Sequence, residues 1–365
     1  DKSIKKFRIQ KIYSFLGLKK IEVEEADAGD IVAIAGLDDI YVGETICKEG
    51  LEEALPLIKV SEPTVQMNFG TNTSPFAGKE GQFVTGRKIE ERLFRETQRD
   101  VSLRINRVDN KEEWIVSGRG ELHLSILIEN LRREGFEFQV SRPRVILKEI
   151  DGVINEPYEY VQVDVPDEYI GSAIEMFGNR RGNLEGMNSK DGQTRLIYTI
   201  PSKGLIGFMT DFLTATHGYG IINHTFLEYR PVQPDVFMGR KLGVLVSINQ
   251  GMATTYACGG VEDRGELLIE PGIMVYEGMI VGICNREEDL AVNITREKQM
   301  TNQRSATKDS TIVLKKPRVF SLENYLSFID EDELVEVTPN SIRLRKMILD
   351  TVERKKYDST KLKKH

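Results

Sequence analysis

The chain has few of the residues on which disulfide-bonded folds and metal centres depend. Among its 365 residues are 3 cysteines, 4 histidines and 1 tryptophan. Cys47, Cys258 and Cys284 lie far apart, in no disulfide or zinc-binding spacing. This scarcity argues against a disulfide framework and against a Cys/His metal site. We therefore expect a reduced, cytoplasmic protein without a bound metal.

Long apolar runs and a phosphate-binding loop are also missing. No stretch approaches the ~20 consecutive apolar residues that span a bilayer, and no secretory signal peptide opens the chain. We therefore expect no membrane partner. The motif Gly-x-x-x-x-Gly-Lys-Ser/Thr, which holds nucleotide phosphates and Mg²⁺ in P-loop GTPases, occurs nowhere. The sequence thus predicts no nucleotide cofactor and no catalytic residues in this chain.

The remaining composition is that of an ordinary soluble protein. Hydrophobic residues make up 40% of the chain and charged residues 29%. The length is sufficient for about two to four domains. A net charge of -7 argues against a uniformly basic nucleic-acid binder but leaves room for a local basic surface.

Two successive segments have the same order of predicted elements. Residues 61–148 give strands at 64–69, 101–108, 113–117 and 136–140, with helices at 87–98 and 121–134. Residues 149–230 give strands at 158–165, 184–187, 194–200 and 221–229, with helices at 170–177 and 205–216. The order βαββαβ predicts a ferredoxin-like domain in each. The apolar faces of the first pair of helices are expected at Ile89, Leu93 and Phe94, and at Leu122, Ile126, Leu127 and Leu131.

The two ends of the chain are richer in short strands. Glycine-separated strands over residues 1–60 suggest a small antiparallel barrel that is incomplete here, as though the chain began inside a domain. Residues 231–365 predict a β-rich domain with short helices at 322–329 and 341–352 and a strand at 311–314. We therefore expect an α+β multidomain protein made of a partial β-barrel, two ferredoxin-like domains and a β-rich C-terminal domain.

A strand-to-helix turn at residues 117–124, Ser-Gly-Arg-Gly-Glu-Leu-His-Leu, is the most specific string. Gly118 and Gly120 permit a tight turn and close backbone approach. Glu121 falls in the first helical turn, where the helix dipole favours a carboxylate. His123 is expected to pack or hydrogen-bond. The string resembles a signature of the third domain of translational GTPases of the elongation factor G group.

Further strings extend this resemblance over essentially the whole chain. They include Val-Pro-Asp-Glu-Tyr-Ile-Gly at 165–171, Gly-Ile-Cys-Asn-Arg at 282–286 and Asn-Ile-Thr-Arg-Glu-Lys at 293–298. Together they resemble the TypA/BipA family of ribosome-associated translational GTPases. The resemblance implies a C-terminal portion of such a GTPase, with GTP and Mg²⁺ bound by an N-terminal domain outside this sequence. It also implies a role in translation, stress response or large-subunit assembly.

A segment of the last domain carries a local excess of positive charge. Residues 296–318 hold seven cations against Glu297 and Asp309, a net +5. The cations are Arg296, Lys298, Arg304, Lys308, Lys315, Lys316 and Arg318. Such a loop suits an RNA backbone, and the resemblance implies that it reaches the acceptor end of tRNA in the ribosomal A site. The alternative is a solvated loop whose charges offset the acidic stretch at residues 330–333.

Other cations are weaker RNA candidates. Arg180 and Arg181 precede Gly182 where a helix meets a hairpin, and the alternative is a helix end that favours cations with Gly182 as its cap. Lys203, before the next helix, is a similar candidate. Residues 343–365 carry a net charge of +6. This tail would act either as a phosphate clamp or as a solubilising tail.

The resemblance implies a monomer with the ribosome as partner, through rRNA, stalk-base proteins and A-site tRNA. An alternative is a free RNA-binding assembly factor for ribosome precursors, which would use the same basic segment. A third possibility is a small-molecule enzyme on the ferredoxin-like fold. Acylphosphatases have an arginine in the loop after the first strand, and residues 70–75 and 166–168 contain none.

Overall fold

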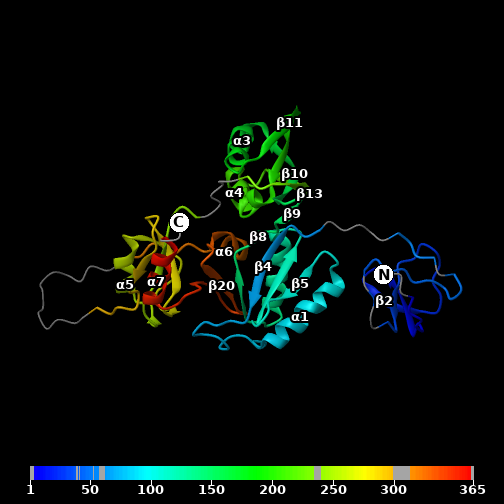
Figure 1. Cartoon of the computed structure of the whole chain (residues 1–365), viewed down its shortest axis with the longest axis horizontal. Helices are drawn as coiled ribbons and strands as arrows, with labels where there is room; N and C mark the ends of the chain where they lie inside the picture. The colour runs from blue at the N-terminus through cyan, green and yellow to red at the C-terminus, as the bar shows by residue number, and fades with distance from the viewer. Residues whose placement is uncertain are drawn as a thin grey trace, which may run out of the picture. The chain divides into compact units, whose positions relative to one another are not determined.

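The computed structural model describes residues 4–37, 40, 42–51, 53–56, 62–233, 240–298 and 313–362. The chain divides into two compact units, one of residues 1–60 with 95–101 and the other of residues 61–94 with 102–365. Strands and helices alternate through it (Figure 1), which confirms the expected α+β class. No helix among the described residues is long and apolar enough to cross a bilayer.

The first unit contains a three-stranded antiparallel sheet in the order β2-β1-β3. Its strands are β1 (Lys11–Leu16), β2 (Lys19–Val23) and β3 (Ala33–Ala35). Gly17, with φ 61°, makes the tight turn between β1 and β2. The described residues of this unit form no closed barrel, so only a sheet of the expected partial barrel is present.

The first ferredoxin-like domain has the expected order of elements. They are β4 (Val65–Gly70), α1 (Gly86–Arg99), β5 (Arg104–Arg107), β6 (Glu113–Gly118), α2 (Glu121–Arg133) and β7 (Phe138–Ser141), with strand order β7-β4-β6-β5.

The prediction of which helix residues face the core was wrong in part. Phe94, Leu122 and Ile126 are exposed. In α2 the buried face runs through Leu124 and Ile128 instead, because these residues join Leu127 and Leu131 on the stripe that meets the sheet.

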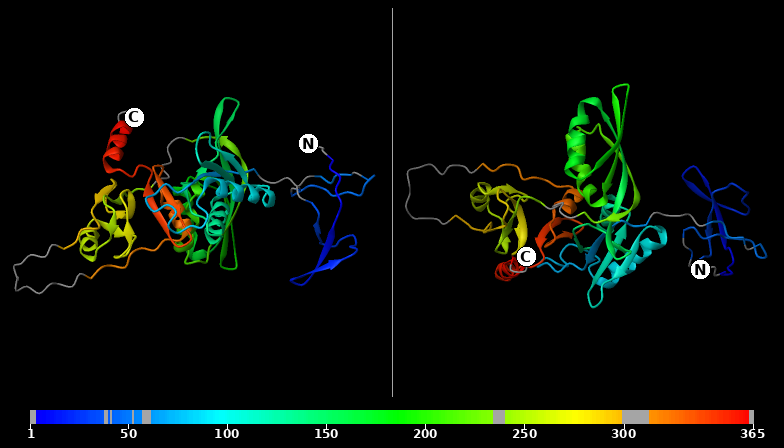
Figure 2. Two further views of the ribbon diagram at one scale, coloured as in Figure 1. Left: turned by 90° about the horizontal axis from the view of Figure 1, so that it is seen from below. Right: turned by 45° about the horizontal axis from the view of Figure 1, so that its top comes forward.

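The second ferredoxin-like domain repeats this plan. Its elements are β10 (Val153–Pro166), α3 (Ile170–Asn179), β11 (Asn183–Lys190), β12 (Gln193–Pro201), α4 (Phe208–Ala215) and β13 (Ile221–Pro231). The strand order is β11-β12-β10-β13, and β9 (Lys148–Ile150) also pairs with β10. Figure 2 (right) shows the green helices against one face of the green sheet.

The helix expected over residues 205–216 starts later than predicted. A 3-10 helix, η2 (Ser202–Leu205), comes first, and α4 begins only at Phe208. Gly207 separates the two with a left-handed φ of 68°, a conformation that ends regular helical hydrogen bonding and favours glycine.

The C-terminal domain is β-rich, as expected. Its strands are β14 (Val244–Ser247), β15 (Gly251–Met252), β16 (Gly265–Leu267), β17 (Met274–Val275), β18 (Met279–Cys284), β19 (Leu290–Val292), β20 (Glu333–Val337) and β21 (Ile342–Lys346). Its helices are α5 (Thr255–Glu262), α6 (Leu322–Phe328) and α7 (Thr351–Leu362).

α6 confirms the helix predicted at 322–329, but the helix predicted at 341–352 is wrong. Residues 342–346 form strand β21, because they pair antiparallel with β20 and β18. α7 begins only at Thr351. Of the strand expected at 311–314, residues 311 and 312 lie outside the described residues, and the other two are not in a strand.

One sheet runs through the first ferredoxin-like domain and the C-terminal domain. β20 pairs antiparallel with β7, placing Val335 opposite Val140 and Val337 opposite Phe138. The strand order is β19-β14-β18-β21-β20-β7-β4-β6-β5, and β8 (Arg144–Val145) pairs with β4. Val335 and Val337 share one apolar core with Phe138 and Val140. The two expected domains are therefore joined by backbone pairing and by a common core.

Candidate nucleic-acid interface

The signature turn lies between β6 and α2, and only one of its glycines is required by packing. A Cβ on Gly118 would lie 2.9 Å from His123 Nδ1 and 3.0 Å from a Leu124 methyl group. Gly120 has an extended backbone, φ 178°, with open space around it, so its expected steric role is wrong. His123 Nδ1 accepts the Arg119 N–H at 3.3 Å, consistent with a hydrogen-bonding role.

Glu121 connects this turn to the second ferredoxin-like domain. Its Oε2 accepts the Gly207 N–H at 2.7 Å, at the start of α4. A Cβ on Gly207 would lie 2.7 Å from Ser327 Cβ in α6. Burial raises the pKa of Glu121 to about 7, against the lowering effect of the Gly207 hydrogen bond, and the nearby Glu323 carboxylate raises it too. The turn is thus a junction of α2, α4 and α6.

Arg180 is engaged within its own domain. Its Nη1 donates to Ile206 O at 2.9 Å and to Gly204 O at 3.3 Å, and its Nη2 lies 3.4 Å from an Asp211 oxygen. These bonds hold the segment that leads into α4. Arg180 is therefore a positioning residue for that segment, and a phosphate would have to compete for its guanidinium.

Arg181 closes α3 in place of the expected Gly182. It adopts the left-handed φ of 63° just beyond the helix. The Arg181 N–H donates to Gly178 O at 3.1 Å and the Gly182 N–H to Phe177 O at 2.8 Å, the paired bonds of a Schellman motif. The Arg181 side chain is exposed, two residues before β11 begins.

The ammonium group of Lys203 is paired with a buried carboxylate. Its Nζ lies 2.8 Å from Glu156 Oε2, and the Glu156 side chain is only 1% exposed. A buried carboxylate without its cation is costly. We therefore leave Lys203 out of the candidate interface.

Both described ends of the basic segment are attached around α5. At the start, Thr254 Oγ1 donates to Arg296 O at 2.6 Å, and the same oxygen accepts the Ala257 N–H as the α5 N-cap. At the end, the Lys315 N–H donates to Glu262 Oε1 at 2.8 Å, in the last turn of α5. The two described ends of segment 296–318 therefore lie at opposite ends of one helix.

The described cations of this segment are on the surface. Arg296, Lys298, Lys315, Lys316 and Arg318 are all exposed. Arg318 pairs loosely with Glu266 at 3.6 Å, and its guanidinium lies 5.2 Å from the Phe320 ring centre. Arg304 and Lys308 lie outside the described residues. The described cations sit where a polyanion can reach them.

The acidic stretch at residues 330–333 has other partners. Arg142 lies 3.2 Å from Asp330, and Lys346 lies 2.9 Å from Asp332 and 2.8 Å from Glu333. Arg240 also pairs with Glu333 at 2.9 Å. Among the described residues, these three cations pair with Asp330, Asp332 and Glu333, while Glu331 is exposed. The ion pairs of the stretch are thus made with cations outside the basic segment.

The expected basic tail also loses part of its charge to internal contacts. Arg343, Arg345 and Lys346 are nearly buried in β21, and Arg354 donates to Ile348 O at 2.8 Å. The exposed cations described on α7 are Lys355 and Lys356. Four of the nine cations counted in residues 343–365 are therefore largely buried within the fold.

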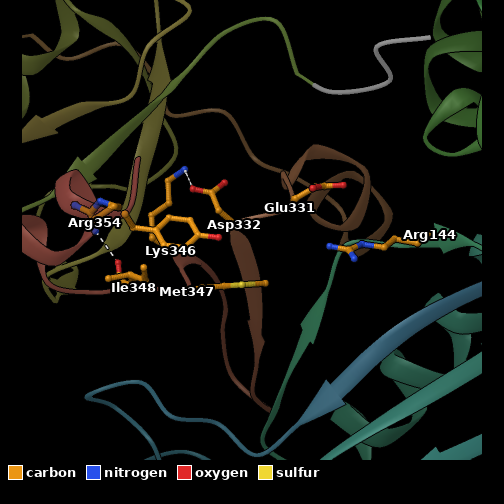
Figure 3. A pocket seen from close by; sticks show the side chains of 8 residues that line it. Arg144, Glu331, Asp332, Lys346, Met347, Ile348 and Arg354 are labelled. Atoms are coloured by element: carbon orange, nitrogen blue, oxygen red, sulfur yellow. Dashed lines mark hydrogen bonds and ion pairs between the residues drawn. The ribbon is translucent and has the colours of Figure 1, made fainter. Parts of the chain in front are cut away.

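A cavity of about 330 Å³ lies beside this region (Figure 3). Arg144, Glu331, Asp332, Lys346, Met347, Ile348, Arg354 and Tyr357 line it. Its three cations outnumber its two carboxylates by one, but Lys346 and Arg354 already have partners. The cavity therefore has no strong attraction for a phosphate. No group of three or more metal-ligating side chains is found among the described residues.

The loop after β4, where an acylphosphatase would bind its anion, makes its contacts with the C-terminal domain. Asn72 Nδ2 donates to Glu336 at 2.9 Å, Ser74 Oγ donates at 3.0 Å, and the Tyr276 hydroxyl donates at 2.7 Å. Phe76 enters an apolar core of the C-terminal domain that includes Leu245 and Val281, edge-on to Tyr276 with ring centres 5.0 Å apart. This loop therefore joins two domains and offers no cation to a small anion.

Family models match along the chain in the order of these domains. The model of the TypA/BipA C-terminal domain matches residues 242–351. The elongation factor G C-terminus matches residues 153–239, and elongation factor G domain III matches residues 84–142. Elongation factor Tu domain 2 matches residues 1–47.

Curated relatives match nearly the whole chain. A protein of Bacillus subtilis (strain 168) is 57% identical over 98% of this chain. Proteins of Synechocystis and of Escherichia coli (strain K12) are 51% and 49% identical over 95% and 96% of it. Each of the three is named large ribosomal subunit assembly factor BipA. The chain spans 58% of the length of each of these relatives.

Proposed function

This chain belongs to the TypA/BipA family, and we propose that it is the ribosome- and RNA-binding portion of a translational GTPase that acts in large-subunit assembly. One observation carries the proposal. Identity of 49–57% extends along 95–98% of the chain to proteins named for that assembly. GTP and Mg²⁺ would bind outside this sequence, which has no phosphate loop. A ribosome-bound role would place the protein in the cytoplasm.

We assign the RNA contact to the basic segment at residues 296–318. Its net charge of +5 stands against -7 for the whole chain. Its described cations are exposed, and Asp330, Asp332 and Glu333 of the acidic stretch pair with cations outside the segment. Cations that neutralise RNA phosphates release counterions, which makes such binding strong at low salt. The proposed target is rRNA and the tRNA acceptor region of the A site, with Arg181 as a second contact.

A second candidate is a free assembly factor that binds ribosome precursors. The printed names of the relatives favour this reading, since each names large-subunit assembly. Both functions would use the same basic segment. They differ in the particle bound, because an A-site ligand needs a mature ribosome whose A site is empty.

The test is co-sedimentation of the chain with mature ribosomes and with precursor large subunits across a salt series. Lys315→Ala with Lys316→Ala is compared with Lys355→Ala with Lys356→Ala, a pair on α7 that removes the same charge. We expect the first pair to weaken binding and flatten the salt slope by roughly one to two units, and the second to change little.

Equal effects of the two pairs would refute the assignment to this segment. Binding to mature ribosomes that is lost when the A site is filled supports the A-site contact. Binding to precursors alone supports the second candidate.

A further inference from the structure

An exposed apolar patch lies at the start of α5, beside the basic segment. Met252 is 57% exposed, Ile273 44%, Met274 45% and Tyr256 39%. We call these four residues the α5 patch. Exposed apolar side chains that gather in one place usually mark a binding surface.

The α5 patch has a fixed backbone. Met252 stands directly opposite Met274 in the antiparallel β15–β17 ribbon. The Ala253 N–H donates to Ile273 O at 2.9 Å, and Ala253 and Val275 are buried beneath. Tyr256 follows in the first turn of α5. Tyr256 lies two residues after Thr254, the N-cap, and four residues after Met252.

Two cations of the basic segment, Arg296 and Lys298, follow a residue that is hydrogen-bonded or packed beside the α5 patch. Thr254, between Met252 and Tyr256, holds the carbonyl of Arg296 at 2.6 Å. A Cβ on Gly251 would lie 3.2 Å from Thr295 Cγ2, so the Thr295 side chain packs against the Gly251 backbone. The exposed Arg296 and Lys298 therefore leave the domain beside the apolar side chains. An occupant of this surface meets an apolar face and positive charge together.

We propose that the α5 patch is a stacking site for an unpaired nucleobase, and that single-stranded RNA is its ligand. This rests on the proposed function and deepens it. Tyr256 supplies the ring face, the two methionines supply polarisable contacts, and Arg296 and Lys298 meet the adjoining phosphates. The charge complementarity favours RNA over an apolar protein surface. In a duplex the base pairs stack on one another and cover the faces of the bases, so a duplex gains only the phosphate contacts.

The experiment measures binding of the whole chain to a short single-stranded RNA and to the same RNA in a duplex, by fluorescence anisotropy across a salt series. Tyr256→Ala should weaken single-strand binding roughly tenfold to a hundredfold. Its salt slope should stay unchanged, because the cations remain. Tyr256→Phe should bind like the parent, and duplex binding should not respond to either change.

Met252→Ala serves as a second variant at a more exposed position, with a smaller loss expected in the same direction. Full single-strand binding by Tyr256→Ala, with a normal salt slope, would overturn the stacking site and leave the proposed function intact. If Tyr256→Ala lost ribosome binding but kept RNA binding, a ribosomal protein would occupy the patch, and the proposal would fall. Absence of salt-dependent ribosome binding by the parent chain would instead count against the proposed function.

Discussion

Glu121→Gln tests whether the signature carboxyl titrates at the junction of α2, α4 and α6. Glutamine has nearly the same shape, and its side-chain oxygen can still accept the Gly207 N–H that Glu121 accepts at 2.7 Å. The substitution therefore removes the proton equilibrium and keeps the contact. Any change in pH dependence reports the carboxyl itself.

The expected magnitude follows from the pKa. Burial raises the pKa of Glu121 from 4.5 to about 7. A group whose folded pKa is raised contributes stability that is fully present below the unfolded value of 4.5 and is lost as the pH rises through about 7. The difference between the two values corresponds to about 3 kcal/mol. Glu121→Gln should therefore gain up to that amount relative to the parent between about pH 5 and about pH 8.

The assay is urea-induced unfolding of both proteins at several pH values in that range, compared as differences between the variants. Glu323→Gln is the control, because it keeps Glu121 but removes a neighbouring charge that raises its pKa. This control should retain part of the pH dependence and move it to lower pH. Parallel stability profiles for Glu121→Gln and the parent would show that Glu121 does not titrate there, and would refute the reasoning.

Two further substitutions test how the second unit is held together. Phe76→Ala should lower the free energy of unfolding by about 3–5 kcal/mol in urea denaturation, because it leaves a cavity beside Tyr276. An unchanged free energy of unfolding would mean that the loop does not fill this core. Gly207→Ala should cost more than about 1–2 kcal/mol, since it meets both a left-handed φ and Ser327. Gly120→Ala, at another helix N-cap but with open space, should cost less than about 1 kcal/mol, and equal losses would contradict the packing argument.

Local patterns predicted the elements of both ferredoxin-like domains. Apolar spacing located the helices, and Gly135, with φ 93°, follows the end of α2. Local patterns failed where two readings fit equally well. Residues 342–346 alternate with a period of two but are rich in residues that also suit a helix, and only pairing with β20 and β18 makes them a strand.

For the candidate interface, sequence identified the basic segment but could not say which cations are available. Lys203 and Arg181 look equivalent as sequence. One pairs with the buried Glu156, while the other is exposed at the end of α3. The exposed fraction of a side chain depends on residues distant along the chain, so charge counting overestimated the tail in the same way.

The sequence by itself determined the family, the order of the elements and the position of the excess positive charge. These features depend on the local spacing of residues and on short sequence motifs, which can be recognised without knowing the structure. The tertiary structure decided that β7 and β20 share one sheet, that Glu121 holds Gly207, and that α5 carries both ends of the basic segment. Each of these joins residues far apart in the chain. Such contacts form only when burial and hydrogen bonding outweigh the entropy of closing a long loop, which no local pattern encodes.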